Sequence, residues 1–340
     1  MIAEPSLSDR PVADEALVSV IIPAYQAERF VAGAVRSALR QTHRTLEVIV
    51  VDDGSTDGTA ARLATIRDPR LRVLRQENAG TAAARNAALA EAQGSYVAFL
   101  DSDDRWFPEK IATELAILQS APTIGIAYSS HYAVDDRGAL LHLAPIRSYA
   151  GSAFDLLLDG DDFLMPSLCL FDRRIFEVIG TFNQVRYHED ADFILRASRE
   201  FPIYPTGRRL AVYRQSTAGK CRAILSNYDR ARDAELALSL GLGPQLTSDQ
   251  AKRLRTNAVR SLYLRFLTYG FSAHARHLQG ELDLSSLRGS TKGRLGYFFA
   301  KTGVNLLDPA RRCVQAYYRA TQQTRWHRLL ASSHLELEYE

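Results

Sequence analysis

The sequence places two carboxylates, Asp101 and Asp103, on either side of Ser102. They directly follow the apolar run 96–100, which predicts a buried strand. In an open α/β sheet, ligands bind beyond the carboxyl ends of the strands. Two carboxylates this close repel each other unless a cation binds, and hard oxygen ligands suit Mg²⁺ or Mn²⁺. The spacing therefore predicts a divalent-cation site, and the alternative is a polar turn that leads into the next helix.

The elements that must position these carboxylates follow from the hydrophobic pattern. Strands are predicted at 18–25, 46–51, 73–74 and 96–100, and helices at 27–39, 81–92 and 107–119. Strands that alternate with helices predict an α/β fold with a mostly parallel, Rossmann-like sheet flanked by helices. Asp104 is expected to cap the helix 107–119, which has Pro108 in its first turn.

Five segments in one order resemble family 2 glycosyltransferases. They are Ser-Val-Ile-Ile-Pro-Ala-Tyr at 19–25, Val-Asp-Asp-Gly-Ser-Thr-Asp at 51–57, Asn78-Ala79-Gly80 with Arg85-Asn86, Phe-Leu-Asp-Ser-Asp-Asp at 99–104, and Gly180-Thr181-Phe182 followed by Glu189-Asp190-Ala191-Asp192-Phe193 and Arg196. The resemblance covers roughly residues 17–216. It implies an inverting glycosyltransferase that uses a nucleotide-diphospho-sugar and has the GT-A type of α/β fold.

The first two strand ends supply the candidates for nucleotide binding. Pro23, Ala24 and Tyr25 end the first strand, so their backbone groups and the Tyr25 ring can meet a nucleobase. The carboxylate of Asp53, after the second strand, can accept an N–H group from a base edge. The resemblance gives Asp53 this base-reading role and places Glu28 near the ribose. A packing role for Tyr25 and a turn-forming role for Asp53 are the alternatives.

The diphosphate and the cation need a clamp of opposite charges. By resemblance, Asp103 ligates the cation, whereas Asp101 faces the ribose or orients metal-bound water. Asp101 and Ser102 are therefore also expected in the nucleotide-sugar site. Arg85 lies on a helix with a small, Ala-rich face and is expected to point toward the anionic ligand. Its alternative is a solvated surface arginine.

Asp190 is the candidate general base. It lies at the start of a predicted amphipathic helix, where the helix dipole favours a carboxylate. Abstraction of a proton from a sugar hydroxyl needs an acceptor within hydrogen-bond reach. A direct displacement with the base opposite the leaving group inverts the anomeric centre. The alternative is that Glu189, Asp190 and Asp192 are only first-turn acids that serve the helix dipole.

One position departs from the family pattern. The family often has Tyr-Arg-x-His after the acceptor half, with a His that helps to hold the metal or diphosphate, and this chain has Ser216 at that place. Either Arg214 or Lys220 takes over the phosphate contacts, or this loop contributes less to them. The departure leaves open how strictly the site requires a metal.

Length and composition predict three regions in the 340 residues, of which 46% are hydrophobic. We expect a disordered segment 1–16, a GT-A catalytic domain 17–225 and a helical C-terminal extension 226–340. Within the catalytic domain, 17–105 is the nucleotide-sugar-binding half and 106–225 is the acceptor half.

Three distant cysteines, Cys169, Cys221 and Cys313, predict reduced thiols in a cytosolic protein. The first sixteen residues contain no apolar segment typical of a signal peptide, and no run approaches the ~20 apolar residues that span a bilayer. We therefore expect a cytoplasmic protein.

The C-terminal region is basic and aromatic. Residues 251–340 contain fifteen Lys and Arg against six Asp and Glu, a net charge of +9, whereas the whole chain is +3. Thr247 to Gln250 resembles a capping box, and a helical hairpin broken at Gly270 is expected after it. The aromatic and basic residues that follow include Tyr297-Phe298-Phe299, Arg311, Arg312, Tyr317-Tyr318, Arg319, Arg325, Trp326 and Arg328. They suit either an anionic membrane surface or a helical cap on the catalytic domain, and the cap is slightly favoured.

The leading functional hypothesis is a metal-assisted transferase of bacterial surface polysaccharide biosynthesis, at the inner face of the plasma membrane. Its partners would be a nucleotide-diphospho-sugar donor and a glycan or lipid-linked acceptor, with peripheral membrane association and no nucleic acid. The alternatives are a nucleotidyltransferase and a non-catalytic glycan-binding relative. A nucleotidyltransferase would need a Gly-rich basic loop after the first strand, and residues 23–28 do not form one.

Overall fold

The structure is a computed structural model. It describes residues 16–159, 164–184, 188–215, 225–229, 231–233, 246–287, 291–302, 304–333 and 335. The expectations for residues 1–15, Ser216, Lys220 and Cys221 therefore lie outside the described residues.

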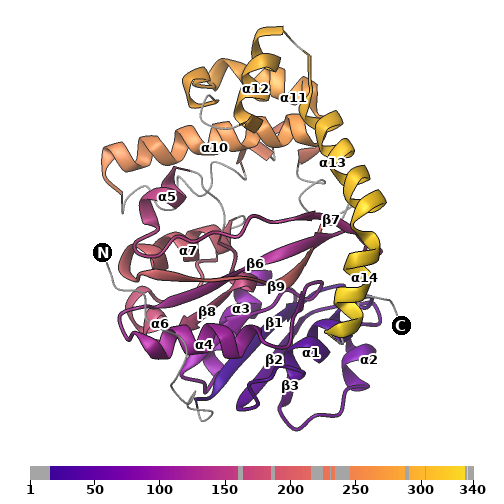
Figure 1. Cartoon of the computed structure of the whole chain (residues 1–340). Coiled ribbons are helices and arrows are strands. Elements are labelled where there is room, and N and C mark those ends of the chain that lie inside the picture. The colour runs from indigo at the N-terminus through magenta and orange to yellow at the C-terminus, as the bar shows by residue number, and fades with distance from the viewer. Residues whose placement is uncertain are drawn as a thin grey trace.

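A nine-stranded sheet forms the centre of the molecule (Figure 1). Its strands are β1 (Val18–Ala24), β2 (Leu46–Asp53), β3 (Leu71–Gln76), β4 (Tyr96–Phe99), β5 (Arg105–Trp106), β6 (Ile126–Val134), β7 (Leu140–Leu143), β8 (Cys169–Asp172) and β9 (Ile203–Arg214). The order is β3-β2-β1-β4-β8-β6-β9-β5, and β7 pairs with β6. The strands from β3 to β4 are parallel, as predicted, and the antiparallel pairs lie beyond β4.

Helices cover both faces of this sheet. They are α1 (Val31–Leu39), α2 (Thr59–Ala64), α3 (Thr81–Glu91), α4 (Lys110–Ser120), α5 (Phe154–Leu158), the 3₁₀ turn η1 (Pro166–Leu168), α6 (Arg174–Ile179) and α7 (Glu189–Glu200). On β1, Val20 and Ile22 belong to the core that includes α1 and α4, whereas Ile21 belongs to the core that includes α3 and α7. Because both faces are buried, β1 is apolar along nearly its whole length. The predicted α/β class with a flanked sheet is confirmed.

Two predicted helix starts are too early. The segment before α1 forms a turn in which Phe30 N–H donates to the Ala27 carbonyl at 2.9 Å, so the helix begins at Val31. Glu109 is the N-cap residue of α4, and the prediction that Asp104 caps this helix is wrong. Asp104 is buried instead, and its Oδ1 accepts a hydrogen bond from the Arg214 N–H at 2.9 Å.

The C-terminal region is helical. It contains α10 (Ser248–Thr268), α11 (Ser272–Leu278), two short 3₁₀ turns, α12 (Thr291–Thr302), α13 (Leu307–Thr321) and α14 (Gln323–Ser332). The capping box at Thr247 and Gln250 is present, and Gly270 with φ +85° ends the first helix of the predicted hairpin. One apolar stripe of α10 is buried, at Leu254, Val259, Leu262, Tyr263 and Phe266.

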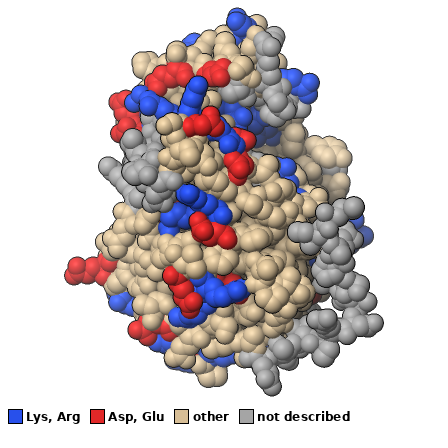
Figure 2. All heavy atoms as spheres, turned by 90° about the vertical axis from the view of Figure 1, so that its left-hand side faces the viewer, with Lys and Arg blue, Asp and Glu red and all other residues tan. Residues whose placement is uncertain are grey.

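This helical layer contacts the part of the chain that contains the sheet through α5 and α7. Leu254 of α10 packs with Phe154 of α5 and Leu195 of α7. Arg253 forms ion pairs with Asp155 at 2.8 Å and Asp159 at 2.9 Å. On the face shown in Figure 2, basic side chains lie beside acidic ones rather than in separate fields. The junction therefore combines a small apolar cluster with ion pairs around it.

The last two helices return to the sheet. In Figure 1, α13 and α14 run down one side of the molecule from the helical layer toward α1. Trp326 of α14 is 2% exposed and lies 5.0 Å from the Tyr132 ring of β6, measured between ring centroids. Its indole N–H donates to the Gly138 carbonyl at 3.1 Å. Trp326 is therefore a packing residue.

Other residues of the predicted basic aromatic tail stay on the surface. Tyr317 is 57% exposed and Val314 is 49% exposed, and Arg325 and Arg328 are also exposed. Within the described part of the chain, no helix has the length and apolar character needed to cross a bilayer.

Replacement of Trp326 by Ala should lower the free energy of unfolding by about 3–5 kcal/mol, because a fully buried aromatic side chain is removed. Chemical denaturation measures this loss. Tyr317→Ala is the control, since Tyr317 is exposed on the adjoining helix and should change stability by only about 0.5 kcal/mol. Similar small losses for both variants would show that α14 does not anchor the helical layer to the sheet.

Candidate active site

The predicted site residues converge because three strands end at one edge of the sheet. Ala24 at the end of β1 pairs in register with Asp52 of β2, and Ile21 of β1 pairs with Phe99 of β4. Asp53 ends β2, and the loops after β1 and β4 carry Tyr25 and the 101–104 segment. A parallel register therefore brings the first, second and fourth predicted segments together.

The loop after β1 is fastened to the loop after β2. Gln26 has φ 50°, an uncommon backbone conformation outside glycine, and its side-chain carbonyl accepts the Thr56 N–H at 2.8 Å. Glu28 accepts the Gly58 N–H at 3.1 Å. Tyr25 is 53% exposed beside this joined loop. Glu28 thus supports the wall of the loop, and the Tyr25 ring is open to a ligand.

Asp53 is buried, and its carboxylate holds the loop that precedes α3. It accepts hydrogen bonds from the Gln76 side chain at 2.7 Å and from the Ala79 and Gly80 N–H groups at 2.9 Å each. Asp53 is only 3% exposed and ends β2, so it does not form the turn that the alternative interpretation gave it. Asp52 instead makes the turn, accepting the Ser55 N–H at 2.9 Å.

Arg85 connects the two halves of the site. Its guanidinium lies 2.9 Å from Asp101 Oδ1 and 3.6 Å from Glu189 Oε1, and it stacks over the Phe182 ring at 5.1 Å. The residue is only 3% exposed, so it is not the solvated arginine of the alternative interpretation. The buried Nε and Nη1 atoms make no hydrogen bond to the described residues. Arg85 therefore keeps donor capacity next to Asp101.

Asp103 carries an unbalanced negative charge. Burial and the neighbouring Asp101 carboxylate raise the pKa of Asp103 from 3.8 to about 6. The two carboxylates repel each other and offer hard oxygen ligands. This donor set fits Mg²⁺ or Mn²⁺ together with substrate phosphates. Among the described residues, no group of three or more His, Cys, Asp or Glu side chains forms a metal site by itself. The residues thus fit a cation that the diphosphate helps to hold.

Asp104, Arg105 and Arg214 form the buried base of this loop. Arg214 donates through Nε to the Asp103 carbonyl at 3.2 Å, and Arg105 donates to the Asp104 carbonyl at 2.7 Å. Burial, together with Asp103 and Asp101, raises the pKa of Asp104 well above its ordinary value. Burial and the nearby Arg214 lower the pKa of Arg105 to about 10. Arg214 therefore contacts the acidic loop from behind, as a support for its backbone.

The three acids at the start of α7 have different surroundings. Glu189 faces Arg85, and Asp192 is 3% exposed and pairs with Arg196 at 2.8 Å. Asp190 is partly exposed, and its Oδ1 accepts the Ala191 N–H at 2.8 Å. The first-turn acids are therefore not equivalent, and Asp190 has no arginine partner among its described contacts.

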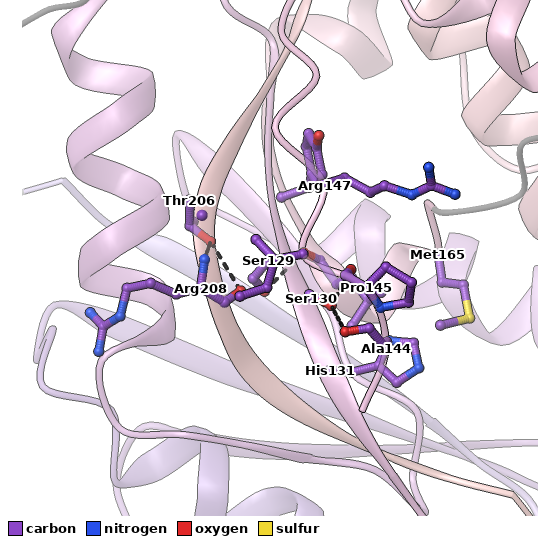
Figure 3. A pocket seen from close by; sticks show the side chains of 13 residues that line it. Ser129, Ser130, His131, Ala144, Pro145, Arg147, Met165, Thr206 and Arg208 are labelled. Atoms are coloured by element: carbon purple, nitrogen blue, oxygen red, sulfur yellow. Dashed lines mark hydrogen bonds between the residues drawn. The ribbon is translucent and has the colours of Figure 1, made fainter. Parts of the chain in front are cut away.

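A separate pocket lies between β6, β9 and η1 (Figure 3). Its walls include Ser129, Ser130, His131, Arg147 and Arg208. Burial lowers the pKa of His131 to about 4, and the nearby His142 and Arg209 add to this effect. The volume is about 120 Å³. None of the predicted site residues lines this pocket, so it is not the site that the motifs describe.

Two contributors to the site have no signal in the sequence. The ion pair of Glu189 with Arg85 depends on the proximity of α3 and α7 in space. Ser167 of η1 accepts the Asp101 N–H at 3.3 Å, and no motif marks it. Ser102 lies in a turn between the two predicted metal ligands, and its place in the nucleotide-sugar site stays a prediction.

The chain resembles known proteins over part of its length. Residues 19–180 match the family described as "Glycosyl transferase family 2". An uncharacterized glycosyltransferase of Rickettsia conorii is 31% identical over 172 residues, which are 49% of this chain and 28% of that protein. The Escherichia coli UDP-Glc:alpha-D-GlcNAc-diphosphoundecaprenol beta-1,3-glucosyltransferase WfgD is 41% identical over 106 residues, 31% of this chain and 42% of that protein. The chain spans less than half the length of these relatives.

Two solved structures have a similar fold over most of the chain. Staphylococcus aureus TarS 1–349 in complex with UDP-GlcNAc has a TM-score of 0.58 at 20% identity, over 89% of this chain and 91% of that chain. The mannosyltransferase PcManGT from Pyrobaculum calidifontis, in complex with GDP-Man and Mn²⁺, has a TM-score of 0.56 at 18% identity, over 95% of this chain and 90% of that chain. These similarities confirm the predicted GT-A type of fold.

Asp103→Asn should stabilise the protein in the absence of cation and nucleotide. The pKa of Asp103 is about 6 in the folded state against the usual 3.8, so folding is penalised fully above pH 6 and the penalty fades as the pH falls toward 4. We expect a gain of about 1–3 kcal/mol at pH 8 and almost none at pH 4. Denaturation at both pH values in EDTA measures the difference. A less stable Asp103→Asn protein at pH 8 would contradict the repulsion from Asp101.

Proposed function

Because residues 19–180 make this chain a member of glycosyl transferase family 2, we propose that it is an inverting glycosyltransferase. It moves a sugar from a nucleotide-diphospho-sugar to a hydroxyl group of a glycan or lipid-linked acceptor. The observation that carries the proposal is the Arg85 bridge, which joins Asp101 beyond β4 to Glu189 beside Asp190. A transferase needs its donor clamp and its base in one site, and this bridge connects the two.

The nucleotide is assigned to the edge formed by β1 and β2. Pro23 and Ala24 offer backbone groups, and the exposed Tyr25 ring offers an apolar face for the base. Asp53 already accepts three hydrogen bonds within the protein. Its contribution to base recognition is therefore chiefly to fix the loop before α3. Glu28 orders the adjoining loop, near the place assigned to the ribose.

The diphosphate is assigned to the 101–104 loop and Arg85. Asp103, with Asp101, would hold a divalent cation, which when bound supplies positive charge for the leaving nucleotide. Ser102 lies between these two aspartates in the sequence, and its hydroxyl is assigned to the same site. Arg85 keeps Asp101 in position, and its buried Nε and Nη1 make no hydrogen bond to the described residues, which leaves donor capacity for the anion. Arg214 holds the Asp103 carbonyl, so the loop is fixed before the donor binds.

Asp190 is the general base of the proposed reaction. It takes the proton from the acceptor hydroxyl while that oxygen attacks the anomeric carbon and the nucleoside diphosphate leaves. The base and the leaving group lie on opposite faces of the sugar, so the configuration inverts. Asp190 suits this role because it is partly exposed, whereas Glu189 and Asp192 are neutralised by arginines.

The acceptor and the pathway are inferred from relatives. The name of WfgD specifies a diphosphoundecaprenol-linked acceptor, which supports a lipid-linked acceptor and a role in surface polysaccharide synthesis here. Such an acceptor would place the protein at the cytoplasmic face of the membrane. The exposed Val314 and Tyr317 of α13, near basic residues of α14, support peripheral binding to an anionic surface.

The domain boundaries stay as proposed from the sequence, with a catalytic domain 17–225 and a helical extension 226–340. The ion pairs of Arg253 support a role for the extension in holding α5 against α10.

The proposed activity is tested by a panel of nucleotide-diphospho-sugars with isolated membrane lipids as acceptor. Release of nucleoside diphosphate is measured with Mn²⁺, with Mg²⁺ and with EDTA. Metal-dependent release from one donor, together with transfer of its sugar to lipid, is the expected result. The absence of release from every donor in the panel would contradict the proposal.

Asp190→Asn should slow transfer by roughly 10²–10⁴-fold, because it keeps the size of the side chain but cannot take up a proton. Donor affinity, measured by calorimetry, should stay near that of the parent. Analysis of the product anomer gives a second readout, since an α-linked donor must yield a β-linked product. Retention of configuration would contradict the mechanism even if Asp190 proved essential.

Two variants at the same helix end serve as controls. Asp192→Asn removes the partner of Arg196, so it should lower stability more than catalysis. Glu189→Gln removes a partner of Arg85 and should weaken donor binding as well as turnover. Equal small losses of transfer rate in all three variants would show that Asp190 is only a helix-end acid. A severe loss of transfer rate in Glu189→Gln alone would identify Glu189 as the base.

Membrane association has its own test. Val314→Ala together with Tyr317→Ala should reduce flotation with vesicles that contain phosphatidylglycerol, because the exposed apolar side chains of α13 are lost. The fold should be unaffected, since neither side chain is buried. Unchanged flotation would favour α13 as a structural cap.

A further inference from the structure

Asn86 of α3 holds the backbone of a residue that lies 96 positions later in the chain. Its side-chain N–H donates to the Phe182 carbonyl at 2.8 Å, and its side-chain carbonyl accepts the Phe182 N–H at 3.0 Å. One amide therefore satisfies both main-chain polar groups of Phe182, which is only 2% exposed. Asn86 belongs to the Arg85-Asn86 pair of the sequence motif, and the proposed chemistry uses only Arg85.

The ring of Phe182 is the surface on which the Arg85 guanidinium lies. The guanidinium carbon is 5.1 Å from the centre of this ring. The ring also stacks on Phe193 of α7 at 4.3 Å and meets Phe99 of β4 edge-on at 5.0 Å, both measured between ring centroids. Because a guanidinium is attracted to an aromatic face, a shift of the Phe182 ring would also shift Arg85.

The segment 179–183 is held from α7 as well. Arg196 of α7 donates to the Ile179 carbonyl at 2.7 Å and to the Thr181 carbonyl at 2.9 Å. The segment therefore lies between two helices, and Asn86 joins it to α3 while Arg196 joins it to α7. Removal of the Asn86 amide would leave the α7 side intact and release the side that faces Arg85.

We propose that Asn86 is a positioning residue of the site, a role that rests on the proposed function. By fixing the main chain of Phe182, it fixes the ring beneath Arg85. The guanidinium can then contact Asp101 at 2.9 Å and Glu189 at 3.6 Å at the same time. A misplacement of about 1 Å in such a group can lower a rate by about a hundredfold. Asn86 pairs with the backbone, so it acts through Arg85 rather than on the reacting atoms.

The first test is nucleotide binding by the full chain, with UDP and GDP as probes, each in the presence of Mn²⁺. Asn86→Ala should weaken the affinity measured by calorimetry by about tenfold, because Arg85 is no longer held beside Asp101. Ala is a better helix former than Asn, so α3 should persist in this variant. Phe182→Leu is a second variant, since it keeps the main-chain bonds to Asn86 and removes the ring, and it should also weaken binding.

Asn305→Ala is the matched control. Asn305 is partly exposed, as Asn86 is, and its amide also joins two main-chain groups. It donates to the Leu267 carbonyl and accepts the Leu307 N–H, both at 2.9 Å. These bonds lie in the helical layer, so their loss should lower the free energy of unfolding without changing nucleotide affinity.

The second test needs no ligand. Chemical denaturation gives the unfolding equilibrium constant of Asn86→Ala, of Glu189→Gln and of the double variant. If Asn86 positions Arg85, Glu189→Gln should change this constant less in the Asn86→Ala protein, because the ion pair is already weakened there. We expect a departure from independent effects of about threefold or more. Asn305→Ala combined with Glu189→Gln should show no such departure.

Either test can overturn the positioning role. It is wrong if Asn86→Ala leaves nucleotide affinity unchanged, or if Asn305→Ala weakens it equally. It is also wrong if Asn86→Ala and Glu189→Gln affect unfolding independently. A parent protein that binds neither nucleotide would contradict the proposed function instead, and the unfolding measurements would still decide whether Asn86 positions Arg85.

Discussion

The arrangement of the site depends on how buried charges are balanced around the end of β4. Asp101, Asp103 and Asp104 lie within four residues, and burial of carboxylates this close is unfavourable unless cations lie among them. Arg85 lies beside Asp101, while Arg105 and Arg214 support the backbone of the loop. The balance is incomplete at Asp103, whose pKa is raised to about 6. The charge at Asp103 therefore lowers the free energy of unfolding, and a bound cation with a diphosphate would offset this loss.

The same charges link the sheet to the helix that carries the proposed base. Arg85 belongs to α3 and Glu189 to α7, so their ion pair ties the two helices on one face of the sheet. The aromatic cluster of Phe99, Phe182 and Phe193 packs directly beneath, with Phe182 and Phe193 stacked at 4.3 Å between centroids. Because Leu254 of α10 packs with Leu195, α7 is held at its start by Arg85 and farther along by α10. A change in the helical layer should therefore be felt at Asp190 without any direct contact.

The parts that could be predicted from the sequence are those in which local pattern and function coincide. The strands that end at Ala24 and Asp53 were recognisable because parallel strands buried on both faces are apolar throughout. The role of Asp104 could not be predicted. An aspartate before a helix has the same sequence signature whether it caps the helix or accepts a hydrogen bond from a distant strand. The partner of Asp104 is Arg214, which is 110 residues away along the chain. The burial of Trp326 was equally invisible, since its neighbours in the sequence are basic and polar.

Arg105 and Arg214 show how the loop after β4 is held from its buried side. Asp101 and Asp103 stay partly exposed, whereas the carbonyl groups of Asp103 and Asp104 accept hydrogen bonds from Arg214 and Arg105. The Asp104 carboxylate lies on the same buried side, where it accepts the Arg214 N–H. The backbone of the loop is therefore the physical connection between the buried arginines and the Asp103 carboxylate.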